Sequence, residues 1–362
     1  MRIKLEKRRE PSMTMLVVTP IASVIVTMLV GIVVFDLIGI DGFRAVVDIF
    51  LTPLFTSYKW QDVAVKAAPL IIISLGLAIG NRAQVWNIGA EGQYIIGALA
   101  ACGVGMAFGT AGGPIVVTPM VAAGIIGGGA WAAIPAGLRT RYSVNEILSS
   151  LMLTYVALQV LNYLVGGPWK DPEGRNFPVT APLADSQTLP VLGTSTVHLG
   201  VLIAVILPFV FWYLMKHSVF GFQIRAVGSA PNAARHGGFD GRQTIWLALV
   251  ISGSMAGLAG SLEFTGVLHK IDLGFPSGYG FTAIIVCFLG RLNPIGCLVA
   301  GIVLAVTYVG GQMAQTSVKI PNSTAGIFQA MMLFFILASD ILIRYRVRVI
   351  PGAKAGAAAV KE

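Results

Sequence analysis

The sequence predicts an all-α polytopic membrane protein with about ten transmembrane helices. Of its 362 residues, 56% are hydrophobic and 11% are charged, whereas a soluble domain carries roughly 25% charged residues. The mean hydropathy of the chain is +0.80. Apolar runs of about 20 residues, the length that a helix needs to cross the hydrocarbon core of a bilayer, recur along most of the sequence.

Ten apolar segments account for these runs. They are residues 15–38, 62–80, 89–108, 114–137, 146–166, 198–215, 243–263, 274–290, 296–315 and 324–343. The first follows a basic N-terminal sequence, yet it is longer than the apolar region of a signal peptide and has no clear A-x-A cleavage site. We therefore expect it to be a retained span.

The distribution of basic residues predicts the orientation in the membrane. With the N-terminus inside, 18 of the 25 Lys and Arg residues fall on cytoplasmic segments and 7 fall outside. Cytoplasmic loops carry such an excess of positive charge. Both termini are therefore expected in the cytoplasm. This requires an even number of spans, for which ten is favoured and eight is the alternative.

One transmembrane domain, residues 15–343, is expected between cytoplasmic tails at 1–14 and 344–362. Its largest external loop, 167–197, is rich in Pro, Gly and small polar residues. That loop is either a solvated connector or a contact for an external partner. The largest cytoplasmic loop, 216–242, is basic and polar.

The centre of this cytoplasmic loop is built to form a short helix. Ser229 is a candidate N-cap, Pro231 suits the first turn, and Gly237-Gly238 can end the helix. A short capped helix on the cytoplasmic face can dock another protein. The predicted docking element comprises Ser229, Ala230, Pro231, Asn232, Ala233, Ala234, Arg235, His236, Gly237 and Gly238.

A polar, glycine-containing break at residues 81–94 is the main candidate for a site at membrane depth. Glu91 precedes residues 92–138, which carry no charge, and a carboxylate in such a place is costly unless it is paired or faces water. Asn87, Glu91 and Gln93 could line a hydrophilic path. Alternatively, Glu91 lies in the first turn of a span, where the helix dipole favours it and Arg82 could pair with it.

The sequence contains two further patterns. Ser143 and Glu146 have the S-x-x-E spacing of a capping box at the start of the fifth span. Residues 75–97 and 258–285 both run from a small-residue helix end through a polar break into a Gly-rich helix start. They would enter the membrane from opposite sides, as inverted repeats do in transporters, although chance resemblance of Gly-rich segments is the alternative.

Catalytic motifs are absent from the sequence. Gly-Lys does not occur, which excludes a Walker A loop, and neither H-E-x-x-H nor G-x-S-x-G is present. Three scattered cysteines offer no metal spacing and no disulfide framework. The basic residues flank apolar spans rather than forming one patch, which argues against nucleic acid as a partner. We expect no enzyme activity, no metal site and no cofactor of its own.

Four blocks carry a resemblance to a known family. They are VWNIGAEGQYIIGALAA (85–101), SVNEILSSLMLTYVAL (143–158), IRAVGSAPNAARHGGFD (224–240) and GYGFTAIIVCFLGRLNPIGCLVAG (278–301). From about residue 60 to 345 the chain resembles permeases of ABC importers in the branched-chain amino acid, ribose and nucleoside branch. The third block is similar to the coupling segment of that family. The first, with N-I-G-x-E-G-Q, looks closest to nucleoside permeases.

The resemblance implies a place in a bacterial plasma (inner) membrane and a fold similar to the vitamin B12 importer permease, with inverted repeats. It also implies several partners. They are cytoplasmic ATPase subunits that bind the ATP, a second permease that is identical or paralogous, and an extracytoplasmic substrate-binding protein. The substrate implied is a nucleoside or a related sugar-containing solute, with ribose or branched-chain amino acids as alternatives.

A neutral, polar solute needs hydrogen-bonding and aromatic side chains along its path, and it needs no fixed countercharge. Asn87, Gln93, Tyr94, Tyr279 and Phe281 suit such a path. The opposing hypothesis is a secondary transporter driven by an ion gradient, which would require carboxylates buried in mid-span. Asp36, Glu91 and Glu263 instead fall near the ends of predicted spans.

Overall fold

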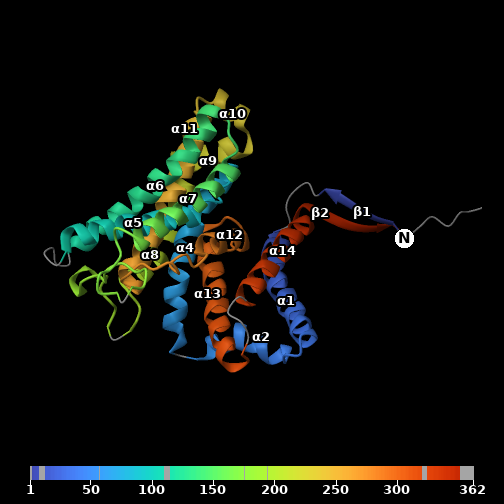
Figure 1. Ribbon diagram of the computed structural model, residues 1–362. Coiled ribbons are helices and arrows are strands. Elements are labelled where there is room, and N and C mark those ends of the chain that lie inside the picture. Colours follow the sequence, from blue (N-terminus) through green and yellow to red (C-terminus); the bar gives the residue numbers. More distant parts are fainter. Residues whose placement is uncertain are drawn as a thin grey trace, which may run out of the picture.

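A computed structural model describes residues 2–7, 13–56, 58–109, 115–174, 176–193, 195–319 and 324–350. The membrane part is built from helices, as predicted from composition (Figure 1). The main helices are α1 (Met13–Leu37), α4 (Lys59–Arg82), α5 (Ala90–Phe108), α6 (Val117–Tyr142), α7 (Glu146–Gly166), α8 (Leu199–His217), α11 (Gly241–Glu263), α12 (Tyr279–Leu289), α13 (Pro294–Ser317) and α14 (Thr324–Arg344).

Each of the ten predicted spans contains one of these helices. Seven helices in the described residues are long and apolar enough to cross a membrane, namely α1, α4, α6, α7, α8, α11 with its extension, and α13. Shorter apolar helices lie at Tyr279–Leu289 and Gly326–Ser339. A multi-pass membrane protein is thus confirmed, and ten as the number of crossings stays a prediction.

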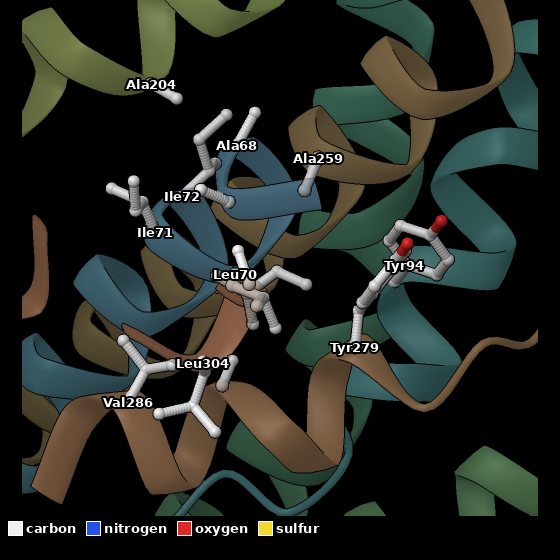
Figure 2. Packing of buried hydrophobic residues seen from close by; sticks show 14 of the residues in the cluster. Ala68, Leu70, Ile71, Ile72, Tyr94, Ala204, Ala259, Tyr279, Val286 and Leu304 are labelled. Atoms are coloured by element: carbon white, nitrogen blue, oxygen red, sulfur yellow. The ribbon is translucent and has the colours of Figure 1, made fainter. Parts of the chain in front are cut away.

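The centre of the molecule is α4. Most of its side chains are buried, with Leu70, Ile72 and Ile73 fully covered, and it packs against α8, α11, α12 and α13. Figure 2 shows its apolar residues meeting the neighbouring helices. A helix that is apolar on all sides is expected at such a central position.

Close packing of α5, α6 and α11 depends on small residues. A Cβ atom on Gly257 of α11 would collide with the carbonyl oxygen of Gly124 in α6 and would lie 2.9 Å from the Cα of Gly128. Small residues let helix backbones approach closely in a membrane, where packing rather than the hydrophobic effect holds helices together. These glycines therefore fix α6 against α11.

The second half of the chain contains a broken helix. After α11 the backbone forms a π-helical turn, η3 (Phe264–Leu268), and then reverses at His269, whose φ is +58°. An extended segment follows and α12 begins at Tyr279, later than the predicted start at 274. At 1.5 Å per residue, the 11 residues of α12 span about 16 Å, which is about half of a hydrocarbon core.

The predicted external loop 167–197 is folded onto this broken region. Backbone amides of Thr180, Leu183 and Leu189 donate to the carbonyls of Ile271, His269 and Thr265 at 2.8–2.9 Å. A single 3₁₀ turn, η2 (Asp185–Gln187), carries Gln187, whose amide donates to the carbonyl of Gly105 at 3.0 Å. The described parts of the loop are therefore an ordered cap and not only a connector.

The remaining elements are short. Helices α2 (Gly42–Phe50) and α3 (Thr52–Phe55) join α1 to α4. The segments β1 (Arg2–Lys7) and β2 (Tyr345–Ile350) pair as antiparallel strands, with Arg2 opposite Ile350. Since these strands come from the two ends of the chain, both described ends lie together (Figure 1). Of the predicted tails, 1–14 and 344–362, residues 1, 8–12 and 351–362 lie outside the described structure.

Candidate translocation and coupling sites

A buried amide cluster occupies the break between α4 and α5. Asn87 and Gln93 bond reciprocally, with the Asn87 amide donating to Gln93 Oε1 at 2.7 Å and the Gln93 amide donating to Asn87 Oδ1 at 3.0 Å. Asn87 also donates to the hydroxyl of Ser252 in α11 at 3.0 Å and accepts from the amide of Gly89 at 3.1 Å. Buried polar groups are stabilised by such complete pairing. The cluster fixes the break against α11.

Glu91 joins the two breaks of the chain. Its carboxylate accepts from the backbone amides of Gly278 at 2.9 Å and Gly280 at 2.6 Å, which belong to the unpaired donors at the start of α12. A Cβ on Gly280 would lie 2.5 Å from the Cα of Glu91, so glycine allows this approach. Arg82 does not pair with Glu91 in the described structure; the positive end of the α12 dipole takes that place.

Aromatic rings surround this junction. Tyr94 stacks on Phe275 with centroids 5.1 Å apart and meets Tyr279 edge-on at 6.0 Å. Tyr279 in turn contacts Tyr308 of α13 at 5.6 Å, and the ammonium of Lys66 lies 5.5 Å from its ring centroid. Such pairs add about 1 kcal/mol each to the burial of the rings. They make the junction of α5, α12 and α13 rigid.

The six predicted path residues therefore come together in space, from segments about 190 positions apart. Five of them are covered by the chain itself: Asn87, Glu91, Gln93, Tyr94 and Tyr279 are each at most 4% exposed. Phe281, on the first turn of α12, is 41% exposed. Their role along a path stays a prediction, and Phe281 is the member that presents its side chain at the surface of this chain.

The predicted docking helix exists as α10 (Pro231–His236). Pro231 occupies the first turn as expected, and the chain leaves the helix through Gly237 and Gly238, the latter with φ of +83°. The prediction that Ser229 caps this helix is wrong. Ala230 is the N-cap residue, and Ser229 instead donates its hydroxyl to the carbonyl of Arg225 at 2.7 Å, because the preceding residues are helical and offer that carbonyl.

That preceding helix, α9 (Val219–Ser229), was missed by the sequence reasoning. Its N-cap Ser218 accepts from the amide of Gly221 at 3.0 Å, and the spacing of Ile224 and Val227 on its buried face was the available signal. Ile224 packs with Ile79 of α4 and Met215 of α8 in a second, smaller apolar core. Helix α10 is thereby braced on the transmembrane helices.

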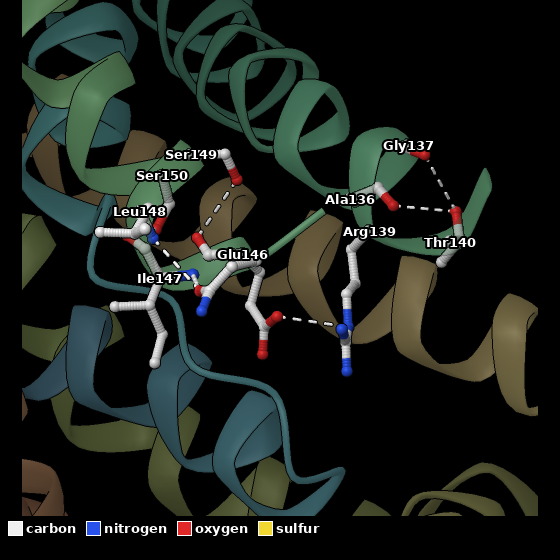
Figure 3. A network of polar contacts seen from close by, with 10 residues as sticks. Ala136, Gly137, Arg139, Thr140, Glu146, Ile147, Leu148, Ser149 and Ser150 are labelled. Atoms are coloured by element: carbon white, nitrogen blue, oxygen red, sulfur yellow. Dashed lines mark hydrogen bonds and ion pairs between the residues drawn. The ribbon is translucent and has the colours of Figure 1, made fainter. Parts of the chain in front are cut away.

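The corner between α6 and α7 differs from the predicted capping box (Figure 3). Asn145 is the N-cap of α7 and accepts from the amides of Ile147 and Leu148. Ser143 lies in the left-handed conformation at the end of α6. Glu146 instead pairs with Arg139, whose Nε lies 3.2 Å from its carboxylate. Asn145 has the extended backbone of an N-cap residue, whereas Ser143 is left-handed, so Asn145 takes the cap.

These features define a multi-pass helical membrane protein with a short helix braced at one end of the bundle and a polar junction between two broken helices. Residues 60–337 match the family described as the permease component of branched-chain amino acid transport systems. The chain belongs to this family of ABC transporter permeases, and members of the family are transport subunits.

Similar proteins cover most of the chain. It is 34% identical to the glucose ABC transporter permease protein TsgB13 of Haloferax volcanii, over 95% of this chain and 93% of that protein. It is 30% identical to the guanosine ABC transporter permease protein NupP of Bacillus subtilis, over 77% and 81% of the two chains. The nucleoside permease NupB of Lactococcus lactis is 23% identical over 91% and 93%. No solved structure matches significantly.

Proposed function

We propose that this chain is the membrane-spanning subunit of an importer that moves a nucleoside or a related sugar-containing solute into the cell. Separate cytoplasmic subunits hydrolyse the ATP. The observation that carries the proposal is the pairing of a braced surface helix, α10, with a polar junction at the broken helices, within a chain of the ABC permease family. Relatives named for guanosine, nucleosides and glucose support a neutral polar solute.

Helix α10 is the proposed contact for an ATPase subunit. Its outer residues are exposed, whereas Ala234 is 5% exposed and faces the chain itself. The small exposed Ala233 permits close approach of a partner. A second permease, identical or paralogous, completes the path, and an extracytoplasmic binding protein delivers the solute to the end that carries the loop 167–197.

The path is proposed to run beside the junction that Asn87, Glu91 and Gln93 organise. Irregular backbone at membrane depth is stable only where protein or water satisfies its polar groups. Here Glu91 satisfies the start of α12, and the exposed Phe281 on the same turn offers a ring for stacking on a base or a sugar. We propose that the protein lies in the plasma membrane with both termini in the cytoplasm.

Uptake by vesicles tests this function. The permease is co-expressed with its candidate ATPase subunits, second permease and substrate-binding protein. Uptake of labelled guanosine and of labelled glucose is followed in right-side-out vesicles loaded with ATP. Asn87→Leu should reduce uptake while the ATPase subunits still co-purify, because the amide pair with Gln93 is lost. Uptake that depends on an ion gradient and not on ATP would favour the secondary-transporter alternative and refute the proposal.

A further inference from the structure

An open cavity of about 770 Å³ lies between the end of α6 and the start of α11, outside the proposed path and outside α10. These two helices pack along each other (Figure 1). The lining includes Arg141 and Tyr142 from α6, together with Arg242, Gln243 and Trp246 from α11. The cavity is therefore a groove at one end of two helices that are long and apolar enough to cross a membrane, bordered by two guanidinium groups and two aromatic rings.

The two arginines are free to bind an external anion. Within the described residues, Arg139 is taken by Glu146, whereas neither Arg141 nor Arg242 forms an ion pair. The carboxylate in the lining, Asp240, caps α11 by accepting from the amides of Arg242 at 2.9 Å and Gln243 at 3.4 Å. The cavity keeps a net positive charge, to which the N-terminus of α11 adds its dipole.

Polarity changes along the groove. Arg141 lies in the last turn of α6, and Ile134 lies seven residues earlier, which is about 10 Å deeper at 1.5 Å per residue. On α11, Trp246 lies about 6 Å deeper than Arg242 by the same measure. Ile134 is 45% and Trp246 is 37% exposed. The ligand that fits is therefore anionic at one end and apolar at the other.

We propose that this groove binds an anionic glycerophospholipid. Its phosphate lies between Arg141 and Arg242, and an acyl chain lies along Ile134 and Trp246. Basic pockets between transmembrane helices bind anionic headgroups in this manner, and an indole at the boundary suits the change from headgroup to chain. Because Arg242 is six residues from the end of α10, the lipid would also hold the start of α11 beside the proposed docking helix.

Quenching of tryptophan fluorescence by brominated lipids tests the proposal on the purified full-length chain in mild detergent. Phosphatidylglycerol with brominated acyl chains is titrated against phosphatidylcholine with the same chains. We expect the anionic lipid to quench at lower concentration, and Trp246→Phe to remove most of that difference. Replacing both arginines by Gln should weaken the anionic lipid about 25-fold, roughly fivefold for each charge.

Matched variants separate charge from folding. The double Arg→Lys variant at 141 and 242 keeps the charge and should bind nearly as the wild type does. Lys216→Gln removes one charge from the end of α8, outside the groove, and should leave binding unchanged. Equal quenching by the two lipids, or unchanged binding by the double Gln variant, would overturn the proposal. If the double Gln variant loses ATPase co-purification while its lipid binding stays intact, the groove is assigned to the ATPase contact instead.

Discussion

The contact between Glu91 and the start of α12 allows a prediction whose magnitude follows from the structure. The carboxylate accepts two amide hydrogen bonds, at 2.9 Å and 2.6 Å, and the side chain is 2% exposed. Hydrogen bonds to a charged group contribute about 1.5–3 kcal/mol each, and a buried charge at a helix N-terminus contributes up to about 2 kcal/mol. These two hydrogen bonds, which we call the Glu91 clamp, therefore hold the start of α12 against α5.

Glu91→Gln tests this contact with little change in shape. The amide keeps one oxygen that can accept from one backbone donor, but its NH₂ group faces the other donor and cannot accept. One charge-assisted bond is lost and the second becomes neutral, so we expect the free energy of unfolding to fall by about 3 kcal/mol. The melting temperature of the purified permease should fall by about 5 °C or more.

Transport should respond in a particular way. Since α12 would be less firmly held, Glu91→Gln should reduce assembly with the ATPase subunits or the coupling of ATP hydrolysis to uptake. The ratio of guanosine to glucose uptake should stay as in the wild type. Glu173→Gln, at an exposed residue outside the contact, is the matched control for stability and should leave the melting temperature unchanged. An unchanged melting temperature, or a switch in solute preference with assembly intact, would refute the reasoning.

Three further predictions follow from other parts of the structure. Ala233→Asp on the exposed side of α10 should abolish uptake and ATPase co-purification at normal membrane expression, because a charge would be buried in the interface; normal uptake would exclude α10 as the docking helix. A cysteine introduced by Phe177→Cys should react with an impermeant thiol reagent from outside, and one introduced by His236→Cys should not. The three native cysteines are buried and should add little background labelling; the reverse pattern would invert the topology. Gly257→Leu should prevent stable folding because its side chain would meet the backbone of α6, whereas Gly166→Leu, with open space around it, should purify normally; equal yields of the two would contradict the packing argument.

The helices themselves could be predicted from the sequence because their signal is local. Apolar length alone located all ten main helices, and Pro231 with Gly238 bounded α10 to within a residue or two. Capping was less predictable. Asn145 and Ala230 occupy the cap positions that Ser143 and Ser229 were expected to help form, because several residues compete for one helix end and the backbone conformation decides among them.

The long-range contacts could not be predicted from the sequence. The sequence grouped the two broken segments along one path, but Glu91 and Gly280 are 189 positions apart, and nothing in either segment specifies this contact. The sequence indicated only that a carboxylate there needed a partner, and the nearby Arg82 was the obvious candidate. The half-length α12 was also hidden, because the Gly/Pro-rich segment before it has enough apolar residues to be counted as part of a span.

The positions of these contacts explain how a movement of α10 could reach the proposed path. Helix α9 continues into α10, and Gly228 of α9 lies directly against the carbonyl of Arg82, the last residue of α4. The chain passes from Arg82 straight into the break that carries Asn87 and Glu91. Glu91 holds the start of α12. A displacement of α9 therefore acts on the end of α4, on the break, and through the carboxylate on α12, without any flexible loop between them. We therefore expect that weakening the Glu91 contact affects coupling more than solute choice, and that a change at Ala233 removes the displacement at its origin.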